Sequence, residues 1–411
     1  MISVTEAEAI IFAAMARAPV VEIALEAAQG EVLRESIVAD RPFPPYHRVA
    51  MDGIALALKT WQAGVRAFPV VGIQRAGDPA RTLADAGQCL EVMTGAVLPV
   101  GCDCVVPVEQ IEPADGIATL PDDLELESMQ NVHVMGSDRP AGAELLSVGT
   151  LLLGPQVAVA AAVGKARVLV AARPRITLIA TGDEIVPVES APLPHQVRRS
   201  NAVALRAALG AAGFRDVVVQ HVPDEPEVIE DALTRALHDS RFVVLTGGVS
   251  EGRYDHVPEV LVRLGVVEKF HKVSQRPGKP LWFGVGPDGQ AVFGLPGNPA
   301  SATVCLYRYV LPALWAHLGA RLKEPAARPH AVLAEDVIFK RPLTLFQPVR
   351  VCDDVRGACR ATPAPMNGSG DLAGLALSDG VVELPAGRRV FAAGEAHVLW
   401  RWADIYGLLA S

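Results

Sequence analysis

Three glycine-rich segments follow one another in the second half of the chain, at residues 246–250 (TGGVS), 276–280 (RPGKP) and 294–299 (GLPGNP). Each adjoins a short apolar run typical of a β-strand. Glycine at the end of a strand lets backbone amide groups crowd around an oxyanion. The side chains that could add charge or hydrogen-bond donors are Arg276, Lys279, Ser250 and Ser301. These segments together predict a binding site for a phosphate or another oxyanion.

A fourth segment of the same kind lies upstream, where the apolar run 176–180 leads into Thr181, Gly182, Asp183 and Glu184. Any one such segment could be an ordinary turn, because glycine and proline punctuate turns everywhere. In open parallel α/β sheets, however, ligands bind outside the carboxyl ends of the strands. Four such segments on one predicted sheet therefore favour a shared crevice.

Acidic residues accompany these loops, and they include Asp183, Glu184, Asp224 and Asp255. Carboxylates beside a phosphate would repel it unless a hard divalent cation lay between them, and Mg²⁺ is the usual choice. The sequence thus predicts Mg²⁺-assisted phosphate or oxyanion chemistry. For Asp224, an alternative role is to cap the helix that follows it.

The predicted crevice needs a sheet to carry it, and residues 171–320 alternate apolar strand-like runs with helical segments. This alternation predicts a doubly wound α/β domain. The turn at 286–289 (GPDG) predicts a hairpin between its final two strands. Asn298 with Pro299 at the first helical position predicts the start of its last helix.

Other parts of the chain have a different character. Ser3 and Glu6 form a possible capping box for a helix to about Arg17, and a second helix is expected over 20–35. Residues 41–138 read as an inserted β-rich domain between the two parts, 1–40 and 139–170, of a helical domain. Residues 326–411 predict a small β-barrel or sandwich. The expected fold is thus multidomain, α/β plus β.

Composition narrows the class of protein. With 411 residues, half of them apolar, the chain should form two to four domains. Its 37 basic and 46 acidic residues give a net charge of −9, which argues against a general nucleic-acid surface. Cys102 and Cys104 are expected to be a packed thiol pair in a reduced, cytoplasmic protein. We expect no membrane span, because Gly149, Gly154 and Pro155 break the uncharged stretch 145–164.

The motifs occur in an order that resembles one family. They are Ala50-Met51-Asp52-Gly53, Met93-Thr94-Gly95-Ala96, Asn131 with Gly136 and Asp138, Arg173-Pro174-Arg175, Thr181-Gly182-Asp183-Glu184, Ser200-Asn201, Gly247-Gly248-Val249-Ser250, Tyr254-Asp255, Pro277-Gly278-Lys279-Pro280, the run from Gly294 to Ser301, and Gly368-Ser369. Essentially the whole chain is thereby similar to the molybdopterin molybdenumtransferases. This family, which includes the E domain of gephyrin, inserts molybdenum into molybdopterin.

The resemblance implies four domains and an elongated homodimer. The inserted β domain of one subunit would lie over the α/β crevice of the other, so that Asp52 and Thr94 act in trans. The implied substrates are adenylylated molybdopterin and molybdate, and the products are molybdenum cofactor and AMP. Molybdopterin adenylyltransferase would supply the substrate, and molybdoenzymes or their chaperones would receive the product.

The resemblance also implies roles for individual residues. Asp255, Asp224 and Glu184, with Asp52 of the partner, would hold Mg²⁺ and position the attacking water. The substrate-binding residues would be Thr181, Gly182, Asp183, Gly247, Gly248, Ser250, Lys272, Arg276, Lys279, Pro296, Asn298, Pro299, Ser301 and Ser369. Lys272 could instead be a solvated strand residue. Leu343 stands where the family has an arginine, and Arg341 and Arg350 are close enough in sequence to replace it.

Three other functions fit parts of this pattern. A non-catalytic protein that binds or delivers molybdopterin would keep the crevice but lose the oxyanion site. A structural dimer that organises partner proteins, as gephyrin does, should carry an added docking surface. A nucleotidyltransferase that uses ATP would need the α/β domain alone. Molybdate-dependent AMP release, pterin binding without turnover, and ATP consumption separate these alternatives.

Overall fold

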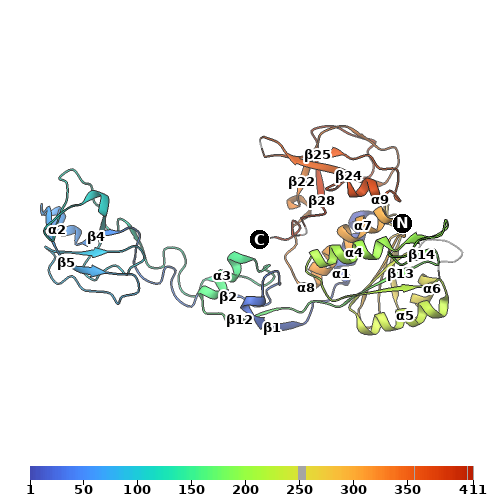
Figure 1. Cartoon of the computed structure of the whole chain (residues 1–411), viewed down its shortest axis with the longest axis horizontal. Helices are drawn as coiled ribbons and strands as arrows, with labels where there is room; N and C mark the ends of the chain where they lie inside the picture. The colour runs from blue at the N-terminus through green and yellow to red at the C-terminus, as the bar shows by residue number, and fades with distance from the viewer. Residues whose placement is uncertain (249–255, 356, 405, 411) are drawn as a thin grey trace. The chain divides into compact units, whose positions relative to one another are not determined.

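The computed structural model describes residues 1–248, 256–355, 357–404 and 406–410. The chain divides into two compact units (Figure 1). The larger unit comprises residues 1–35, 148–157 and 167–411, and the smaller comprises 36–147 and 158–166. The predicted division into four domains stays a prediction.

A six-stranded sheet forms the centre of the larger unit. Its first four strands are mutually parallel, and the fifth is antiparallel to both of its neighbours, so that it alone runs in the opposite direction among the six. In spatial order they are β16 (Val217–Val222), β13 (Ile176–Thr181), β17 (Phe242–Thr246), β21 (Ala291–Leu295), β20 (Trp282–Val285) and β18 (Val267–His271). The antiparallel pair β20 and β21 confirms the hairpin predicted at 286–289.

Helices cover both faces of this sheet. Helix α4 (Ser200–Ala211), which connects β13 to β16, shares a core with α1 (Val4–Ala14), α7 (Pro299–Cys305) and α8 (Leu311–Leu318). Helix α5 (Pro226–Asp239), which connects β16 to β17, packs with α6 (Val257–Arg263) in a second core. From β13 the chain crosses through α4 to β16 at the edge of the sheet, and from β16 it returns through α5 to β17 on the other side of β13. The connections of the neighbouring strands β13 and β17 therefore run to opposite sides, which creates a topological switch point between them. The doubly wound prediction is confirmed.

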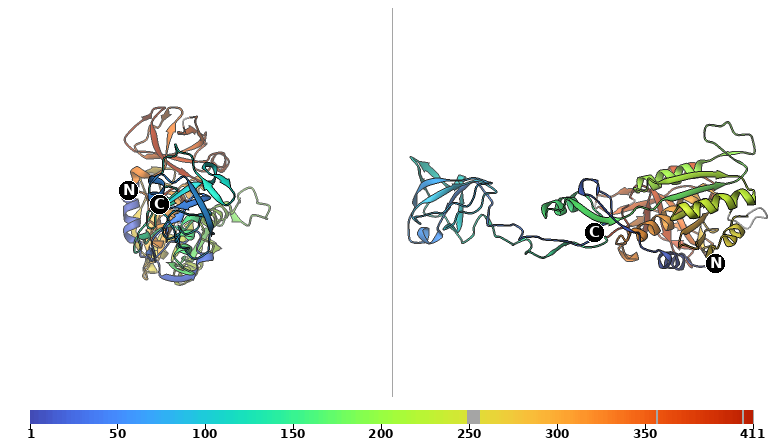
Figure 2. Two further views of the ribbon diagram at one scale, coloured as in Figure 1. Left: turned by 90° about the vertical axis from the view of Figure 1, so that its left-hand side faces the viewer. Right: turned by 90° about the horizontal axis from the view of Figure 1, so that it is seen from below.

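The C-terminal strands close into a barrel, drawn in red in Figure 2. Strand β24 pairs with both β25 and β26, and the ring is completed through β22 and β28. Their bounds are β22 (His330–Leu333), β24 (Thr344–Asp353), β25 (Cys359–Pro363), β26 (Gly380–Leu384) and β28 (Ala396–Arg401). Smaller elements beside it are β23 (Val337–Ile338), β27 (Val390–Phe391) and α9 (Leu372–Ala376). The prediction of a small barrel is confirmed.

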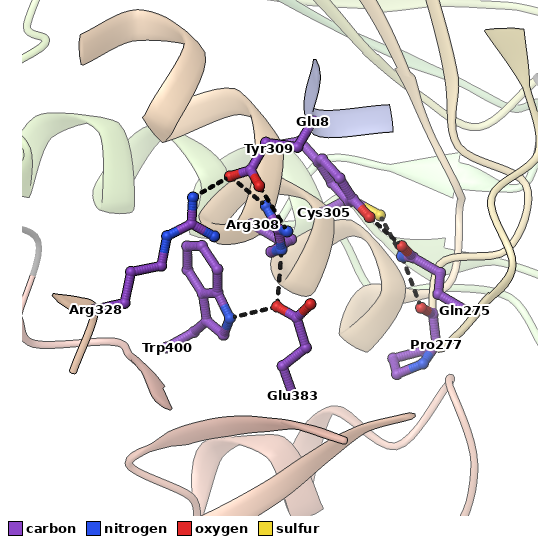
Figure 3. Close-up of polar contacts among 9 residues, drawn as sticks. All are labelled: Glu8, Gln275, Pro277, Cys305, Arg308, Tyr309, Arg328, Glu383 and Trp400. Atoms are coloured by element: carbon purple, nitrogen blue, oxygen red, sulfur yellow. Dashed lines mark hydrogen bonds and ion pairs between the residues drawn. The ribbon is translucent and has the colours of Figure 1, made fainter. Parts of the chain in front are cut away.

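A buried ion cluster holds the barrel against the helices of the larger unit (Figure 3). Arg308 is only 2% exposed. Its Nη1 lies 3.0 Å from Glu8 Oε1 on α1, and its Nε lies 2.9 Å from Glu383 Oε2 on β26. Arg328 Nη2 lies 2.6 Å from the same Glu8 oxygen, and Trp400 Nε1 donates to Glu383 at 2.9 Å. Two cations and two carboxylates thus balance one another.

The N-terminal segment follows the sequence prediction only in part. The capping box is confirmed, because Ser3 Oγ accepts from the Glu6 amide at 3.1 Å and Glu6 Oε2 from the Ser3 amide at 2.7 Å. The helix expected over 20–35 is wrong. Residues Val20–Ala24 form β1, which pairs with β12 (Arg167–Ala171), because a segment rich in β-branched residues favours a strand once a partner is available. Helix α3 (Gly154–Ala162) begins beside Pro155, as predicted.

The smaller unit is β-rich, as predicted. Its six-stranded sheet runs in the order β7 (Cys104–Pro107), β4 (Gly53–Leu56), β6 (Cys89–Val92), β5 (Ala67–Gln74), β9 (Ile117–Thr119) and β8 (Glu112–Ala114). It also contains α2 (Leu58–Gln62) and the pairs β2 (Ile37–Val38) with β11 (Glu144–Leu146) and β3 (Arg48–Val49) with β10 (Val132–His133). Cys102 and Cys104 are buried free thiols. Among the described helices of the whole chain, none is long and apolar enough to span a membrane.

Candidate functional site

A cavity of about 1040 Å³ opens at the carboxyl ends of β13, β17 and β21 in the larger unit. This is where ligands bind in a doubly wound sheet, beside its switch point. The cavity brings together ten of the predicted residues, which are Thr181, Glu184, Gly247, Arg276, Lys279, Pro296, Asn298, Pro299, Ser301 and Ser369. The sequence prediction that these loops converge therefore agrees with the geometry.

Other predicted residues lie outside the cavity wall. Gly182, Gly248 and Lys272 do not line it, and neither do Asp183 and Asp224. The last two are neighbours, because the Asp224 amide donates to Asp183 Oδ1 at 3.1 Å. Ser250 and Asp255 lie outside the described residues.

Asp52 and Thr94 belong to the smaller unit, where they contact each other. The Thr94 amide and hydroxyl both donate to Asp52 Oδ1, at 2.6 and 2.8 Å. The backbone and side-chain hydrogen bonds from Thr94 lower the pKa of Asp52, so its carboxylate is ionised at neutral pH. Their predicted action in the partner's crevice stays a prediction.

Positive charge dominates the cavity wall, although the chain as a whole carries −9. The basic residues that line it are Arg198, Arg199, Arg276, Lys279 and Arg341. Glu184 is the one acidic side chain that the described residues contribute to the wall. A local excess of cations in an acidic protein indicates an anionic ligand.

Most of these cations have no partner among the residues that the structure describes. Within the described ranges, the side chains of Arg276, Lys279 and Arg341 make no hydrogen bond or ion pair. Arg199 Nε is buried and likewise has no partner there. Lys279 and Arg341 are exposed and Arg276 is half-buried, so solvent stabilises these charges and an anionic ligand can reach them.

Glycine is required where the loops approach one another. Gly247 has φ +89°, and a Cβ there would lie 2.7 Å from the backbone oxygen of Thr181. Gly278 has φ +92°, and its Cβ would lie 2.5 Å from Gln275 Nε2. These positions explain the Thr-Gly-Gly and Pro-Gly-Lys patterns as packing requirements of the cavity wall.

Hydrogen bonds connect the separate walls. Asn201 Nδ2 on α4 donates to the Gly297 carbonyl at 2.7 Å, and Asn298 Nδ2 donates to Ser369 Oγ at 3.1 Å. The second bond joins the loop after β21 to the C-terminal region that carries Ser369. The site is therefore built across the α/β domain and the barrel segment.

Sequence reasoning missed Arg198, Arg199 and Gln275. Arg198 ends β15 (Val197–Arg198), which pairs with β14 (Ile185–Val186), and Arg199 is the N-cap residue of α4. Arg198 Nε donates to the Ser190 carbonyl at 3.1 Å. Their position directly before the Ser200-Asn201 motif was the available signal. Gln275 precedes Arg276 and carries no charge that would have marked it.

Leu343, which is predicted to stand where the family that the motifs resemble has an arginine, also lies in the wall. Leu343 and Arg341 both line the cavity, whereas Arg350 does not. Arg350 Nε instead donates to the Leu377 carbonyl at 3.1 Å. Of the two predicted substitutes, Arg341 is thus the one that reaches the site.

The acidic residues fit Mg²⁺ in a limited way. Within the described ranges, no three His, Cys, Asp or Glu side chains form a group that could hold a metal ion. Mg²⁺ is usually held by one or two carboxylates together with substrate phosphates and water, so Glu184 in the wall can serve. The helix-cap alternative for Asp224 is wrong, because Glu225 occupies the N-cap of α5.

Family models match the chain in three successive parts. Residues 2–164 match the MoeA N-terminal region (domain I and II), and residues 177–316 match a probable molybdopterin binding domain. Residues 330–397 match the MoeA C-terminal region (domain IV). The order of the three matches follows that of the motifs.

Individual relatives match over nearly their full length. A molybdopterin molybdenumtransferase from Synechocystis is 40% identical, over 92% of this chain and 94% of its own. One from Bacillus subtilis is 31% identical, over 90% and 87%. The crystal structure of the molybdopterin biosynthesis moeA protein of Pyrococcus horikosii superimposes with a TM-score of 0.78 at 26% identity, covering 98% of this chain and 99% of that one.

Proposed function

This chain belongs to the molybdopterin molybdenumtransferase family, and we propose that its cavity inserts molybdate into adenylylated molybdopterin and releases AMP. The observation that carries the proposal is a set of cations in the wall that have no partner among the described residues: Arg199, Arg276, Lys279 and Arg341. Both substrates are anions, and both are needed at one place. The cavity offers several separated positive charges for them.

Molybdate would bind at the end of the cavity that contains Arg276 and Lys279. A tetrahedral dianion needs fixed donors and positive charge, and the Ser301 and Ser369 hydroxyls lie in the same wall. Arg276 presents a planar fork of N–H donors, whereas Lys279 presents a compact charge. Lys272 and Arg350 lie outside the wall, so Arg341 is the better candidate for a third cation.

The pyrophosphate of the adenylylated substrate would lie at the other end, beside Thr181 and Gly247. Hydrolysis breaks its phosphorus–oxygen bridge: water adds to one phosphorus, and the products are AMP and the pterin monophosphate. Mg²⁺ held by Glu184 and substrate oxygens would neutralise the pyrophosphate and polarise the bond being broken. Asp183 and Asp224 would orient water near that metal, and Asp255 is proposed for the same task. Thr181 Oγ1 is buried without a partner among the described residues, so it can donate to the substrate.

The enzyme is proposed to work as a cytoplasmic homodimer. Asp52 and Thr94 of one subunit would complete the partner's cavity. The adenylylated substrate must come from a molybdopterin adenylyltransferase, and the product must pass to molybdoenzymes or their chaperones.

The test is a product assay with the full-length protein. Incubation with adenylylated molybdopterin, Mg²⁺ and molybdate should release AMP, measured by chromatography. Omission of molybdate, or chelation of Mg²⁺, should suppress that release. Absence of any molybdate-dependent AMP would contradict the proposal.

Leu343 favours the main alternative, a non-catalytic protein that binds or delivers molybdopterin. Its presence in the wall removes one cation from the expected oxyanion end. The alternative predicts calorimetric binding of adenylylated molybdopterin without AMP release. Arg341 in the same wall supports the catalytic proposal instead.

A further inference from the structure

The loop that carries Arg276 and Lys279 rests on a buried neutral network (Figure 3). Gln275 is fully buried, and its Nε2 donates to the Pro277 carbonyl at 3.0 Å. The Tyr309 hydroxyl, 1% exposed, donates to Gln275 Oε1 from the opposite side. Tyr309 does not line the cavity, and among the described residues its hydroxyl is connected to the loop through Gln275.

The rest of the loop backbone is also fixed. The Cys305 thiol lies 3.9 Å from the Gly278 carbonyl, which also accepts from the Leu281 amide at 3.1 Å. The Lys279 carbonyl accepts from the Val273 amide at 3.0 Å. Strand β19 (Gln275–Arg276) pairs in parallel with β24 of the barrel. The carbonyl groups of Pro277, Gly278 and Lys279 thus each accept a hydrogen bond, while the charged side chains of Arg276 and Lys279 have no partner among the described residues.

Only one orientation of the Gln275 amide satisfies both neighbours. With Oε1 toward Tyr309, Nε2 can donate to the Pro277 carbonyl. A flipped amide would place its oxygen against that carbonyl, where neither atom has a proton to donate. The Pro277 carbonyl, which can only accept, therefore determines which way the amide points, and the Tyr309 hydroxyl then donates to the amide oxygen and holds the side chain against that carbonyl.

We propose that Tyr309 and Gln275 are positioning residues that hold the 276–279 loop in the geometry that binds molybdate. The proposal rests on the proposed function of the cavity and adds residues that do not touch the reacting atoms. Burial raises the pKa of Tyr309 well above its ordinary value of 10, although the Arg308 charge opposes this. The hydroxyl thus remains a donor throughout the working pH range.

Tyr309→Phe tests the proposal, because it removes the hydroxyl and keeps the ring. Tyr307→Phe is the matched control. Its hydroxyl donates to the Trp402 carbonyl at 3.1 Å and is not connected to the loop. Molybdate affinity, measured by calorimetry on the full chain, should fall about three- to tenfold in Tyr309→Phe, the range expected for one lost hydrogen bond. It should be unchanged in Tyr307→Phe.

Two further measurements separate positioning from general damage. The affinity for adenylylated molybdopterin should stay within about twofold in both variants, because the pyrophosphate end does not depend on this loop. In turnover, the KM for molybdate should rise in Tyr309→Phe while kcat at saturating molybdate is kept. A merely structural role would weaken both substrates alike.

Gln275→Met keeps the proposal testable if Tyr309→Phe folds poorly, because it removes the hydrogen bond to the Pro277 carbonyl directly and should also weaken molybdate binding about three- to tenfold. Because Tyr309 acts through Gln275, the double variant, where it folds, should bind molybdate no more weakly than Gln275→Met alone. Equal molybdate affinity in wild type and Tyr309→Phe would overturn the positioning proposal and leave the proposed function standing. A wild type that binds no molybdate would overturn both.

Discussion

Arg308 and Tyr309 are consecutive residues of the π-helical turn Leu306–Val310, yet they anchor two buried networks of opposite kinds (Figure 3). Arg308 joins charged groups from α1 and the barrel, whereas Tyr309 joins neutral groups next to the 276–279 loop. Paired buried charges are very costly to break but contribute little beyond an apolar replacement of the whole set. Losing a neutral hydrogen bond costs less free energy, but the bond depends more strongly on the orientation of its donor and acceptor. We therefore expect the charged network around Arg308 to matter mainly for the stability of the fold, and the neutral network around Tyr309 to matter mainly for ligand binding.

Breaking the ion cluster should have the largest effect. Arg308→Met leaves the Glu8 and Glu383 carboxylates buried with reduced compensation, which should cost about 3–5 kcal/mol of the free energy of unfolding. Denaturation with urea measures it. Arg263→Met is the control, because its ion pair with Glu230 is exposed and should be worth less than about 1 kcal/mol. A similar decrease of the free energy of unfolding in Arg308→Met and Arg263→Met would show that the buried cluster contributes no more than an exposed ion pair.

Removing a cation from the cavity should affect binding and spare stability. Lys279→Met should weaken molybdate binding roughly 10- to 100-fold, the range for hydrogen bonds to a charged group. The free energy of unfolding should change by less than about 0.5 kcal/mol, since this exposed side chain has no partner in the described structure. Lys269→Met, at an exposed position of β18 outside the cavity wall, should bind molybdate normally. Undiminished binding by Lys279→Met would remove this lysine from the oxyanion site.

Breaking the neutral network should lower the free energy of unfolding less than breaking the ion cluster does. Tyr309→Phe leaves the Gln275 oxygen without its donor, which should lower the free energy of unfolding by about 1–2 kcal/mol. Urea denaturation of Tyr309→Phe and Arg308→Met under the same conditions compares the two networks directly. Equal losses in these two adjacent substitutions would contradict the distinction between the networks.

The smallest expected effect is a difference in pH dependence. Burial raises the pKa of Glu8, but Arg308 and Arg328 lower it more, so it lies below its ordinary 4.5. A lowered carboxyl pKa gives stability that is present above about pH 4.5 and lost as pH falls through the folded value. Denaturation at several acidic pH values should show a shallower loss in Glu8→Gln than in wild type. Parallel slopes would remove Glu8 as a source of acid sensitivity.

The fold was predictable where local pattern and tertiary partner agree. The alternation over 171–320 specified the doubly wound sheet, because each strand and helix carries its own periodicity. The segment 20–35 was misread because the strand Val20–Ala24 is defined by its pairing with residues 167–171, far away in sequence. Nothing in the sequence around residues 20–24 indicates that they pair with residues 167–171.

The site was predictable to the same extent. Arg276 and Lys279 stand in a recognisable glycine motif, so their convergence with Thr181 and Ser301 followed from the sheet topology. Gln275 and Tyr309 could not be recognised, because neither residue has a role without the other. Ser250 and Asp255 lie outside the described residues, so their predicted roles stay predictions.

The π-helical turn has a consequence for how this chain can change in length. Helix α7, the turn and α8 form one continuous run from Pro299 to Leu318. A π turn holds one residue more than an α turn, so deleting one residue within 306–310 would let the turn relax to an ordinary α-helix and leave α8 in nearly the same rotational phase. Trp315 and Leu318, both fully buried, would then keep their places in the core. Adding a residue to α7 or α8 would instead rotate the helix after it by about 100°, so the π turn is the place where this run can shorten by one residue without losing its core.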